Sequence, residues 1–334
     1  MTTDARDYRI FGSELSPYSV KVRSYFRYKG IPHAWIVRNA GSAAEYQRYA
    51  RLPLIPAVAT PEGKAMQDST PILEALEARF PEPSIHPGEP VAAFVSALLE
   101  EHGDEWGNKW MFHYRWTYEP DQISCAERIA REQLPEGGED QVRSLAAAIR
   151  TRMLPRLGFV GSSEQTRPLI ERSFVRTLER LEAHLASREY LFGGRPAFAD
   201  FGVAPQLYES LTDPTPGRLV RERAPRTCAW IERMLEPHAQ GPFERWCALE
   251  PTLLPLLRDE VAGLFLPWSA ANARALEAQQ ETFEVELADG RFAQKPQKYH
   301  ARSLAALRER YARVGGNAEL DDVLERSGCL RWLR

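Results

Sequence analysis

Cysteine is scarce in this chain of 334 residues, and it never occurs in closely spaced pairs. The four cysteines, Cys125, Cys228, Cys247 and Cys329, are widely scattered. This scatter disfavours a disulfide framework and a zinc site of clustered thiols. It is typical of unpaired thiols in a reducing compartment, so we expect a cytoplasmic protein without a metal.

Long apolar runs and a strong net charge are also missing. No apolar run approaches the roughly 20 residues that a membrane-spanning helix needs, and residues 1–7 lack the apolar core of a signal peptide. The net charge is −3, whereas nucleic-acid binding favours a basic face. We therefore expect no membrane and no nucleic acid as a partner. The hydrophobic share of 43% is enough for a sizeable core, and the length predicts at least two domains.

Among the features that are present, the stretch Ser13–Lys21 is the most informative. It follows a short strand candidate, Tyr8–Phe11, and leads into apolar residues at helical spacing that end at Gly30. Pro17 suits the first position of that helix. Such a turn aims free backbone N–H groups and the positive end of the helix dipole at whatever lies over the loop, which favours an anion.

A regular series of short elements follows, each bounded by turn or capping residues. Pro56 cannot donate to a central ladder position, which favours a cis bond after Ile55 at a sheet edge. Asp68 and Ser69 are N-cap residue types before an apolar-periodic run. The expected elements are a strand at 31–37, a helix at 43–49, a strand at 52–58, a hairpin turn at 62–63 and a helix that opens at 67–72 and runs through 80.

Three motifs in this order resemble the N-terminal domain of the glutathione S-transferase (GST) family. They are Ser16-Pro17-Tyr18, Ile55-Pro56 and Gln67-Asp68-Ser69. The resemblance, to serine-type and bacterial-like members, implies an α/β thioredoxin-like N-terminal domain followed by an all-α GST C-terminal domain. A small extra β-hairpin and a helix are expected near the C-terminus.

Composition predicts where the domains begin and end. The proline-rich stretch Phe80–Pro90 predicts a linker. We expect the thioredoxin-like, glutathione-binding domain at 1–82, the all-helical domain at 91–250 and a C-terminal extension at 251–334 that packs on the helical domain. The alternatives for the extension are a lid over the substrate site and a larger dimer contact. Within the extension we expect one or two helices over 253–278, a β-hairpin over 283–294 and a last helix over 299–313.

Helical periodicity dominates the second domain. Helices are expected at 139–153, 165–187 and 224–235, and another opens at Ala199-Asp200. The start of the helix at Ala199-Asp200 resembles the capping box of the family's C-terminal domain, but Ala197 occupies the position where a capping hydroxyl is usual. The missing hydroxyl should weaken the helix start by roughly 0.5–2 kcal/mol.

Ser16 is the catalytic residue that the resemblance implies, as a hydroxyl donor to the glutathione thiolate. A free thiol has a pKa of about 8.5, and lowering it by about two units needs roughly 2.7 kcal/mol of preferential stabilisation. A hydrogen bond to the charged sulfur supplies roughly 1.5–3 kcal/mol, and the helix N-terminus adds roughly 0.3–1 kcal/mol. Ser13 is the runner-up and Tyr18 the third candidate. The structural alternative for Ser16 is a plain N-cap of its own helix.

The resemblance also implies where glutathione, the expected co-substrate, is bound. The backbone at Ile55 and Pro56 would pair with the cysteinyl part of glutathione. Ser69 would bind the γ-glutamyl carboxylate, Asp68 would bind the ammonium group, and Gln67 is a further candidate. For Asp68 and Ser69 the alternative is plain helix capping, and both roles are compatible.

Other charged residues have weaker patterns. Arg51 or Lys64 would bind the glycyl carboxylate of glutathione, with plain surface charge as the alternative. Glu100, Glu101 and Asp104 share helical spacing but lack a ligand pattern such as His-Glu-x-x-His, so no metal site is expected.

The pocket for the second substrate is expected between the domains, over Ser16. The family places its hydrophobic pocket on the first long helices of the second domain, which are rich in aromatic residues here. The alternative is that this aromatic stripe is core and that its histidine is simply packed. The candidate lining residues are Tyr18, Trp106, Trp110, His113, Tyr114 and Trp116.

The function that the resemblance implies is a detoxification transferase of alkyl or aryl groups. It would conjugate the glutathione thiolate to a small, electrophilic, partly apolar compound, and the family relationship also implies a homodimer. Two alternatives stay open. One is a non-catalytic binding or scaffold protein with this fold, and the other is a glutathione-dependent thiol reductase. The reductase is disfavoured because Ser16 and Ser19 cannot form a mixed disulfide.

Overall fold

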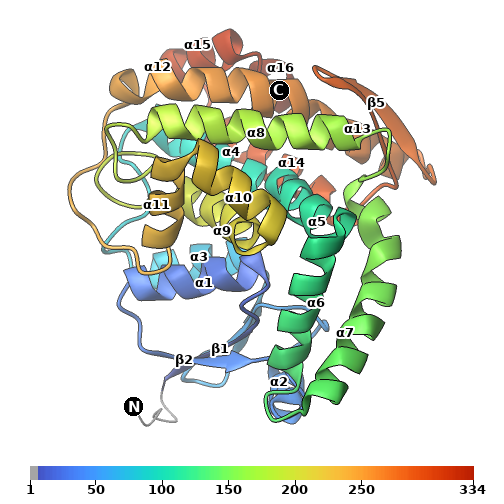
Figure 1. The fold of residues 1–334 in the computed structure, drawn as a ribbon. Helices are drawn as coiled ribbons and strands as arrows, with labels where there is room; N and C mark the ends of the chain where they lie inside the picture. The colour runs from blue at the N-terminus through green and yellow to red at the C-terminus, as the bar shows by residue number, and fades with distance from the viewer. Residues whose placement is uncertain (1–6) are drawn as a thin grey trace.

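A computed structural model describes residues 7–334, and it contains a small α/β domain below a larger helical part (Figure 1). The expected fold class, an N-terminal α/β domain followed by an all-helical domain with an extra hairpin and helix, is confirmed. No helix among these residues combines the length and the apolar character that a membrane crossing requires.

The N-terminal domain is a four-stranded sheet with the order β2-β1-β3-β4. β1 runs parallel to β2 and antiparallel to β3, which in turn pairs antiparallel with β4. Helices α1 and α3 lie between the sheet and the helical domain (Figure 1). The elements are β1 (Tyr8–Gly12), α1 (Pro17–Tyr28), β2 (His33–Val37), α2 (Ala43–Tyr49), β3 (Ala57–Ala59), β4 (Ala65–Gln67) and α3 (Ser69–Arg79).

The expected strand at 52–58 is much shorter in the structure. β3 begins only at Ala57, directly after the cis bond between Ile55 and Pro56. The proline has no N–H to donate to a ladder, so residues before it form an irregular loop. The predicted cis bond is confirmed, and the loop before it is free to border a cavity.

The helical domain is a bundle in which one hairpin, α6–α7, descends beside the N-terminal domain as far as α2 (Figure 1). Helix α6 was not expected, because its buried face consists mainly of small residues such as Ala126 and Ala130. The elements are α4 (Pro90–His102), the π-helical turn η1 (Gly103–Gly107), α5 (Asn108–Thr117), α6 (Glu119–Gln133), α7 (Glu139–Met153), the 3₁₀ segment η2 (Leu154–Val160), α8 (Arg167–His184), α9 (Phe198–Thr212), α10 (Pro214–Arg223) and α11 (Pro225–Arg233).

Helix α9 is the centre of this bundle and contacts α4, η1, α5 and α1. Two glycines allow it to approach closely: a Cβ on Gly103 would lie 2.6 Å from the carbonyl carbon of Gly202. At its start, Asp200 accepts hydrogen bonds from the backbone N–H of Ala197 (2.8 Å) and from the indole of Trp230 (2.8 Å). The carboxylate half of the cap therefore forms although the hydroxyl half is missing.

The C-terminal extension covers the top of the helical domain in Figure 1. Its hairpin and the helix at 299–313 were expected, whereas the two short helices after them were not. α12 packs on α8, while α14 and α15 pack on α4. The elements are α12 (Trp246–Leu256), the π-helical segment η3 (Leu257–Phe265), α13 (Leu266–Glu277), β5 (Phe283–Leu287), β6 (Gly290–Gln294), α14 (Lys298–Arg313), α15 (Ala318–Ser327) and α16 (Leu330–Leu333).

Candidate functional site

Ser16 is the N-cap of α1, which is the structural alternative that the sequence left open. Its side-chain oxygen accepts a hydrogen bond from the backbone N–H of Ser19 at 3.3 Å, and Pro17 occupies the first helical position. Capping uses a lone pair of the hydroxyl oxygen, so the O–H hydrogen of Ser16 stays available as a donor. The two roles are therefore compatible in one side chain.

The loop before Ser16 is held by the helical domain. The hydroxyl of Ser13 donates to the carboxylate of Glu132 on α6, which also accepts from the backbone N–H of Glu14 at 2.7 Å. Arg115 on α5 donates to the carbonyl oxygen of Leu15 at 3.2 Å. Because the proton of Ser13 is already engaged with a carboxylate, this runner-up is the poorer donor to an external thiolate.

Tyr18 has no free proton either. Its hydroxyl donates to the carbonyl oxygen of Asp104 at 3.0 Å and accepts from the amide of Asn108 at 3.1 Å. Burial raises the pKa of this hydroxyl, and the nearby Asp104 carboxylate raises it further. Tyr18 is therefore a wall of the site and an interdomain contact, which leaves Ser16 as the most available of the three candidate donors.

A cavity of about 690 Å³ brings together the five predicted glutathione-binding residues. Tyr18 also lines it, whereas Ser16, two residues earlier, does not. The residues predicted as a set are Ile55, Pro56, Gln67, Asp68 and Ser69. The sequence motifs thus converge on one cavity at the N-terminus of α3.

Asp68 has a backbone that few non-glycine residues adopt, with φ at +80°. Asparagine and aspartate tolerate this left-handed region better than most residues, and such conformations cluster at functional sites. The side chain of Asp68 does not cap α3. It instead accepts a hydrogen bond from the hydroxyl of Tyr299 in the C-terminal extension, at 2.5 Å.

Gln67 has a structural role that the sequence did not reveal. Its side-chain oxygen accepts from the backbone N–H groups of Arg51 and Leu52, at 2.8 and 3.1 Å. Its side-chain nitrogen donates to the carbonyl oxygens of Leu52 and Leu54, at 2.9 and 3.0 Å. Gln67 therefore fixes the loop in front of Pro56, and its amide is already satisfied without a ligand.

A buried charge network lies beside the cavity and joins the two domains. The ammonium group of Lys21 on α1 lies 2.6 Å from the carboxylate of Asp104 and 2.8 Å from the hydroxyl of Thr70, and it also pairs with Glu100. The Lys21 side chain is only 1% exposed. Burial raises the pKa of Asp104, and the positive charge of Lys21 opposes this rise.

Sequence reasoning missed Lys21 altogether. A signal existed, since Lys21 is four residues before the buried Tyr25 and four after the buried Pro17, on the face of the helix that turns inward.

The predicted aromatic pocket is instead the core of the helical domain. The indoles of Trp106 and Trp110 both donate to the hydroxyl of Ser173 at 2.9 Å, and His113 is fully buried against Ser162 at 2.7 Å. None of these side chains lines the 690 Å³ cavity. Tyr114 borders a separate cavity of about 580 Å³. Of the predicted lining residues, only Tyr18 is placed at the cavity that holds Pro56.

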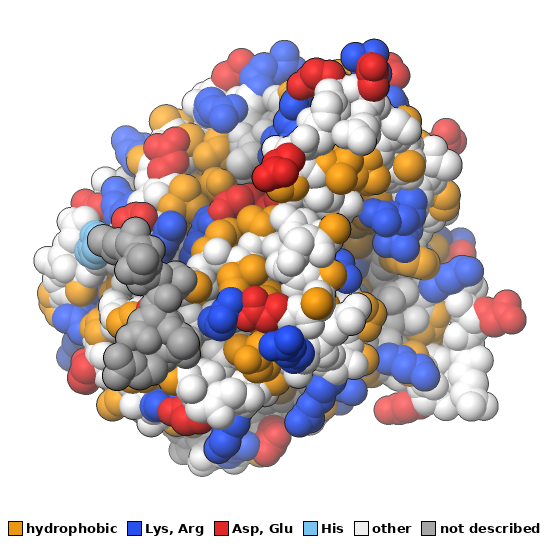
Figure 2. Space-filling model, turned by 90° about the horizontal axis from the view of Figure 1, so that it is seen from below, with side chains coloured by type: hydrophobic (Ala, Val, Ile, Leu, Met, Phe, Trp, Pro, Cys, Tyr) orange, Lys and Arg blue, Asp and Glu red, His pale blue; other side chains and the backbone are white. Residues whose placement is uncertain are grey.

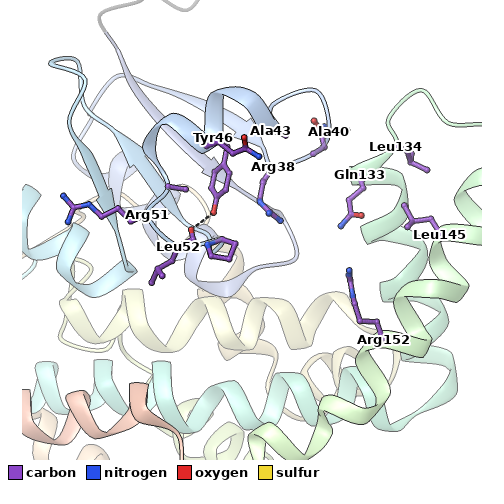
Figure 3. Close-up of a pocket in the computed structure, with 14 residues that line it drawn as sticks. Arg38, Ala40, Ala43, Tyr46, Arg51, Leu52, Gln133, Leu134, Leu145 and Arg152 are labelled. Atoms are coloured by element: carbon purple, nitrogen blue, oxygen red, sulfur yellow. Dashed lines mark hydrogen bonds between the residues drawn. The ribbon is translucent and has the colours of Figure 1, made fainter.

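A second cavity, of about 570 Å³, lies between α2 and the α6–α7 hairpin. Figure 3 shows Arg38 and Arg152 pointing toward the same gap from the two domains, with Gln133 beside them. Arg51 also lines this cavity and borders the first one as well. Within residues 7–334, none of these three guanidinium groups has a carboxylate partner within 4 Å. The cavity is therefore suited to an anionic group.

The lower face of the molecule, which includes the sheet side of the N-terminal domain, mixes charged and hydrophobic side chains (Figure 2). Lys and Arg are scattered there among acidic and apolar groups, and no continuous basic stripe crosses the face. The basic character of the second cavity is thus local.

The protein's own thiols are poor candidates for the nucleophile. Cys125 and Cys329 are buried, and burial raises the pKa of each to about 12. Cys247 is exposed and Cys228 is half-buried. None of the four lines either cavity. In the part of the chain that the structure describes, no group of three or more His, Cys, Asp or Glu side chains is arranged to hold a metal ion.

Comparison with known proteins gives two family matches. The glutathione S-transferase N-terminal domain matches residues 10–84, and the glutathione S-transferase C-terminal domain matches residues 136–233, together just over half of the chain. No curated protein sequence matches significantly.

Several solved structures resemble the chain at low identity. A glutathione S-transferase from Methylobacterium radiotolerans JCM 2831, in complex with glutathione sulfonate, is 20% identical, with a TM-score of 0.41 over 72% of this chain and 99% of that one. The beta-etherase LigF from Sphingobium sp. strain SYK-6 is 20% identical, with a TM-score of 0.49 over 68% of this chain and 94% of that one.

Proposed function

Because the chain belongs to the glutathione S-transferase family, we propose that it binds glutathione in the 690 Å³ cavity and transfers it to a small electrophile. The observation that carries the proposal is the convergence of Pro56, Asp68 and Ser69 on this single cavity. The backbone at Pro56 pairs with the cysteinyl part, Ser69 binds the γ-glutamyl carboxylate, and Asp68 binds the ammonium group.

In the proposed reaction, Ser16 donates a hydrogen bond to the sulfur of glutathione and favours its thiolate. The thiol proton leaves to solvent, and the sulfur lone pair attacks an electrophilic carbon. A carbon–sulfur bond forms while the leaving group departs with its electron pair. The hydrogen bond from the Ser16 hydroxyl and the N-terminus of α1 together supply the roughly 2.7 kcal/mol that a two-unit fall in thiol pKa requires.

The 570 Å³ cavity favours a second substrate that carries an acidic group. It meets the first cavity at Arg51 and Leu52, which line both, and it contains the guanidinium groups of Arg38 and Arg152. Among pairs of benzylic halides that differ only in a ring carboxylate, we expect the carboxylate to be preferred. Arg152→Gln should remove this preference and leave the neutral halide unaffected.

Thiolate absorbance in the ultraviolet tests the central step. With wild-type protein, bound glutathione should show a thiol pKa well below 8.5, and Ser16→Ala should return it toward that value. If the depressed pKa persists in Ser16→Ala, the role passes to Ser13 or to the backbone N–H groups. Absence of glutathione binding would contradict the enzyme proposal and favour the scaffold alternative.

The thiol reductase alternative is weakened by the burial of Cys125, whose raised pKa makes it a poor nucleophile. It would be revived by disulfide reductase turnover that Cys125→Ser abolishes. A homodimer, a cytoplasmic location and a role in detoxification are further proposals that rest on the family relationship. Sedimentation velocity tests the first of these directly.

A further inference from the structure

The C-terminal extension reaches the proposed glutathione cavity. Helix α14 lies beyond both segments that the family domains match, the second of which ends at residue 233. Two side chains from its first turns, Tyr299 and Arg302, nevertheless line the 690 Å³ cavity beside Asp68. The wall of the cavity is thus shared between the N-terminal domain and the last part of the chain.

Helix α14 is anchored in this position along its length. Leu304 and Leu307 are buried against the rest of the protein, with 1% and 0% exposure. His300 makes a hydrogen bond to Glu105 at the start of the helix, and burial lowers the pKa of this imidazole to about 4, so the contact is not an ion pair near neutral pH. Arg310 pairs with Glu74 of α3 nearer the end of the helix. The polar first turn is therefore held over the cavity by apolar packing, a hydrogen bond and an ion pair.

The charges that line the cavity are opposite in sign and equal in number to those of glutathione. Its lining contains one acid, Asp68, and two bases, Arg51 and Arg302. Within residues 7–334, neither guanidinium group has a carboxylate within 4 Å. Glutathione carries one ammonium group and two carboxylates, and guanidinium groups bind carboxylates with two parallel hydrogen bonds.

The residues of α14 in the cavity wall suit one end of the ligand, the γ-glutamyl end. Tyr299 contacts Asp68 directly, Arg302 follows three residues later on the same face of α14, and both side chains line the cavity. The ammonium group and the α-carboxylate of the γ-glutamyl residue sit on the same carbon atom. A site that binds this end therefore needs an acid and a base in the same cavity wall, and Asp68 and Arg302 both line this cavity.

We propose that the extension completes the glutathione site, with Arg302 binding the γ-glutamyl α-carboxylate and Tyr299 positioning Asp68 for the neighbouring ammonium group. This inference rests on the proposed function, because it assigns residues to the same ligand. It gives the segment after residue 250 a role in ligand recognition in addition to packing.

Isothermal titration with glutathione and two analogues tests the proposal. γ-Aminobutyryl-Cys-Gly lacks the α-carboxylate, and glutaryl-Cys-Gly lacks the ammonium group. Arg302→Gln should weaken glutathione binding about tenfold or more and leave γ-aminobutyryl-Cys-Gly unchanged. Tyr299→Phe should weaken glutathione binding severalfold and leave glutaryl-Cys-Gly unchanged. Arg313→Gln, on the same helix but paired with Glu309, is the matched control and should leave the binding of all three ligands unchanged.

The outcomes separate this inference from the proposed function. If the wild type binds glutathione and Arg302→Gln binds it equally well, the inference fails and the proposed function stands. Equal losses for glutathione and both analogues would show a merely structural effect and would also overturn it. If the wild type binds no glutathione, the proposed function fails and the inference fails with it. Thermal unfolding of each variant verifies that the protein tested is folded.

Discussion

The two walls of the proposed glutathione cavity are built in different ways. The wall from the N-terminal domain is a loop, a cis-proline and a helix start, and Gln67 fixes its loop with four hydrogen bonds. The wall from the extension consists of two long side chains, Tyr299 and Arg302, on a helix that is held mainly by packing.

In the proposed site, this difference separates two tasks. The N-terminal wall presents backbone groups at fixed positions, which suits the peptide part of the ligand. The extension presents side chains at one end only, where a charged group must be recognised. The cavity therefore combines a rigid scaffold with a wall whose contribution depends on how well α14 is docked. The following predictions test this comparison.

The largest expected effect is on the rigid side, at the buried lysine. Lys21→Met leaves the carboxylates of Glu100 and Asp104 buried without their cation. Breaking a buried ion pair by removing one partner costs roughly 3–5 kcal/mol of unfolding free energy. Urea denaturation measures this, and Arg143→Gln, which breaks an exposed pair with Asp140, is the control that should change little. A small loss in Lys21→Met would contradict the central role of this network.

The next effect concerns the docking of α14. Leu307→Ala truncates a fully buried side chain on the apolar face of α14, and it should lower the unfolding free energy by roughly 2–5 kcal/mol. In this variant, amide hydrogen exchange should accelerate more in residues 298–313 than in the N-terminal sheet. The affinity for glutathione should fall in parallel. If affinity stays unchanged while α14 exchanges faster, the extension does not contribute to the ligand site.

The same contrast explains how much the sequence could predict. The N-terminal wall could be predicted from local signals, because Pro17, Pro56 and the Gln67-Asp68-Ser69 motif each determine the backbone conformation of the residues next to them. The contact between Asp68 and Tyr299 joins residues 231 positions apart. No local pattern encodes such a contact, so helix α14 could be predicted as a helix but not its place over the cavity.

The aromatic residues of the helical domain show a second limit of sequence-based prediction, because one pattern fits two structural roles. Trp106 in η1 and Trp110 and His113 in α5 belong to a helical stretch of the kind that could line a pocket. A stripe of core residues would have the same composition and the same spacing. Only the tertiary packing, in which both indoles share the hydroxyl of Ser173, decides for the core. Similarly, the three arginines of the second cavity come from separate segments and could not be grouped in advance.

A smaller effect on the unfolding free energy is expected when the pH is lowered, and it comes from His102 at the contact between the helical domain and η3. His102 is buried between Trp110 and Phe265, and burial lowers its pKa to about 3. In the unfolded chain it has the ordinary value of about 6.5. As pH falls below that value, the unfolded state takes up a proton that the folded state excludes. The unfolding free energy should therefore fall by about 1.4 kcal/mol per pH unit from this group.

The matched test compares the pH dependence of stability in two variants. His102→Phe should flatten the loss of stability between about pH 6 and pH 4, because phenylalanine has no group that the unfolded state can protonate. His238→Gln changes an exposed histidine and should leave the pH dependence as in the wild type. An unchanged slope in His102→Phe would show that other groups dominate in this range.

The smallest effect on stability is at Ser16, where it separates capping from catalysis. Ser16→Ala removes the bond to the Ser19 N–H and should cost roughly 0.5–2 kcal/mol, whereas Ser16→Gly should cost only a few tenths of a kcal/mol. Both variants lose the hydroxyl donor, so both should raise the pKa of bound glutathione to the same extent. If Ser16→Gly instead keeps the depressed pKa while Ser16→Ala loses it, the geometry of the α1 N-terminus, and not the hydroxyl, stabilises the thiolate.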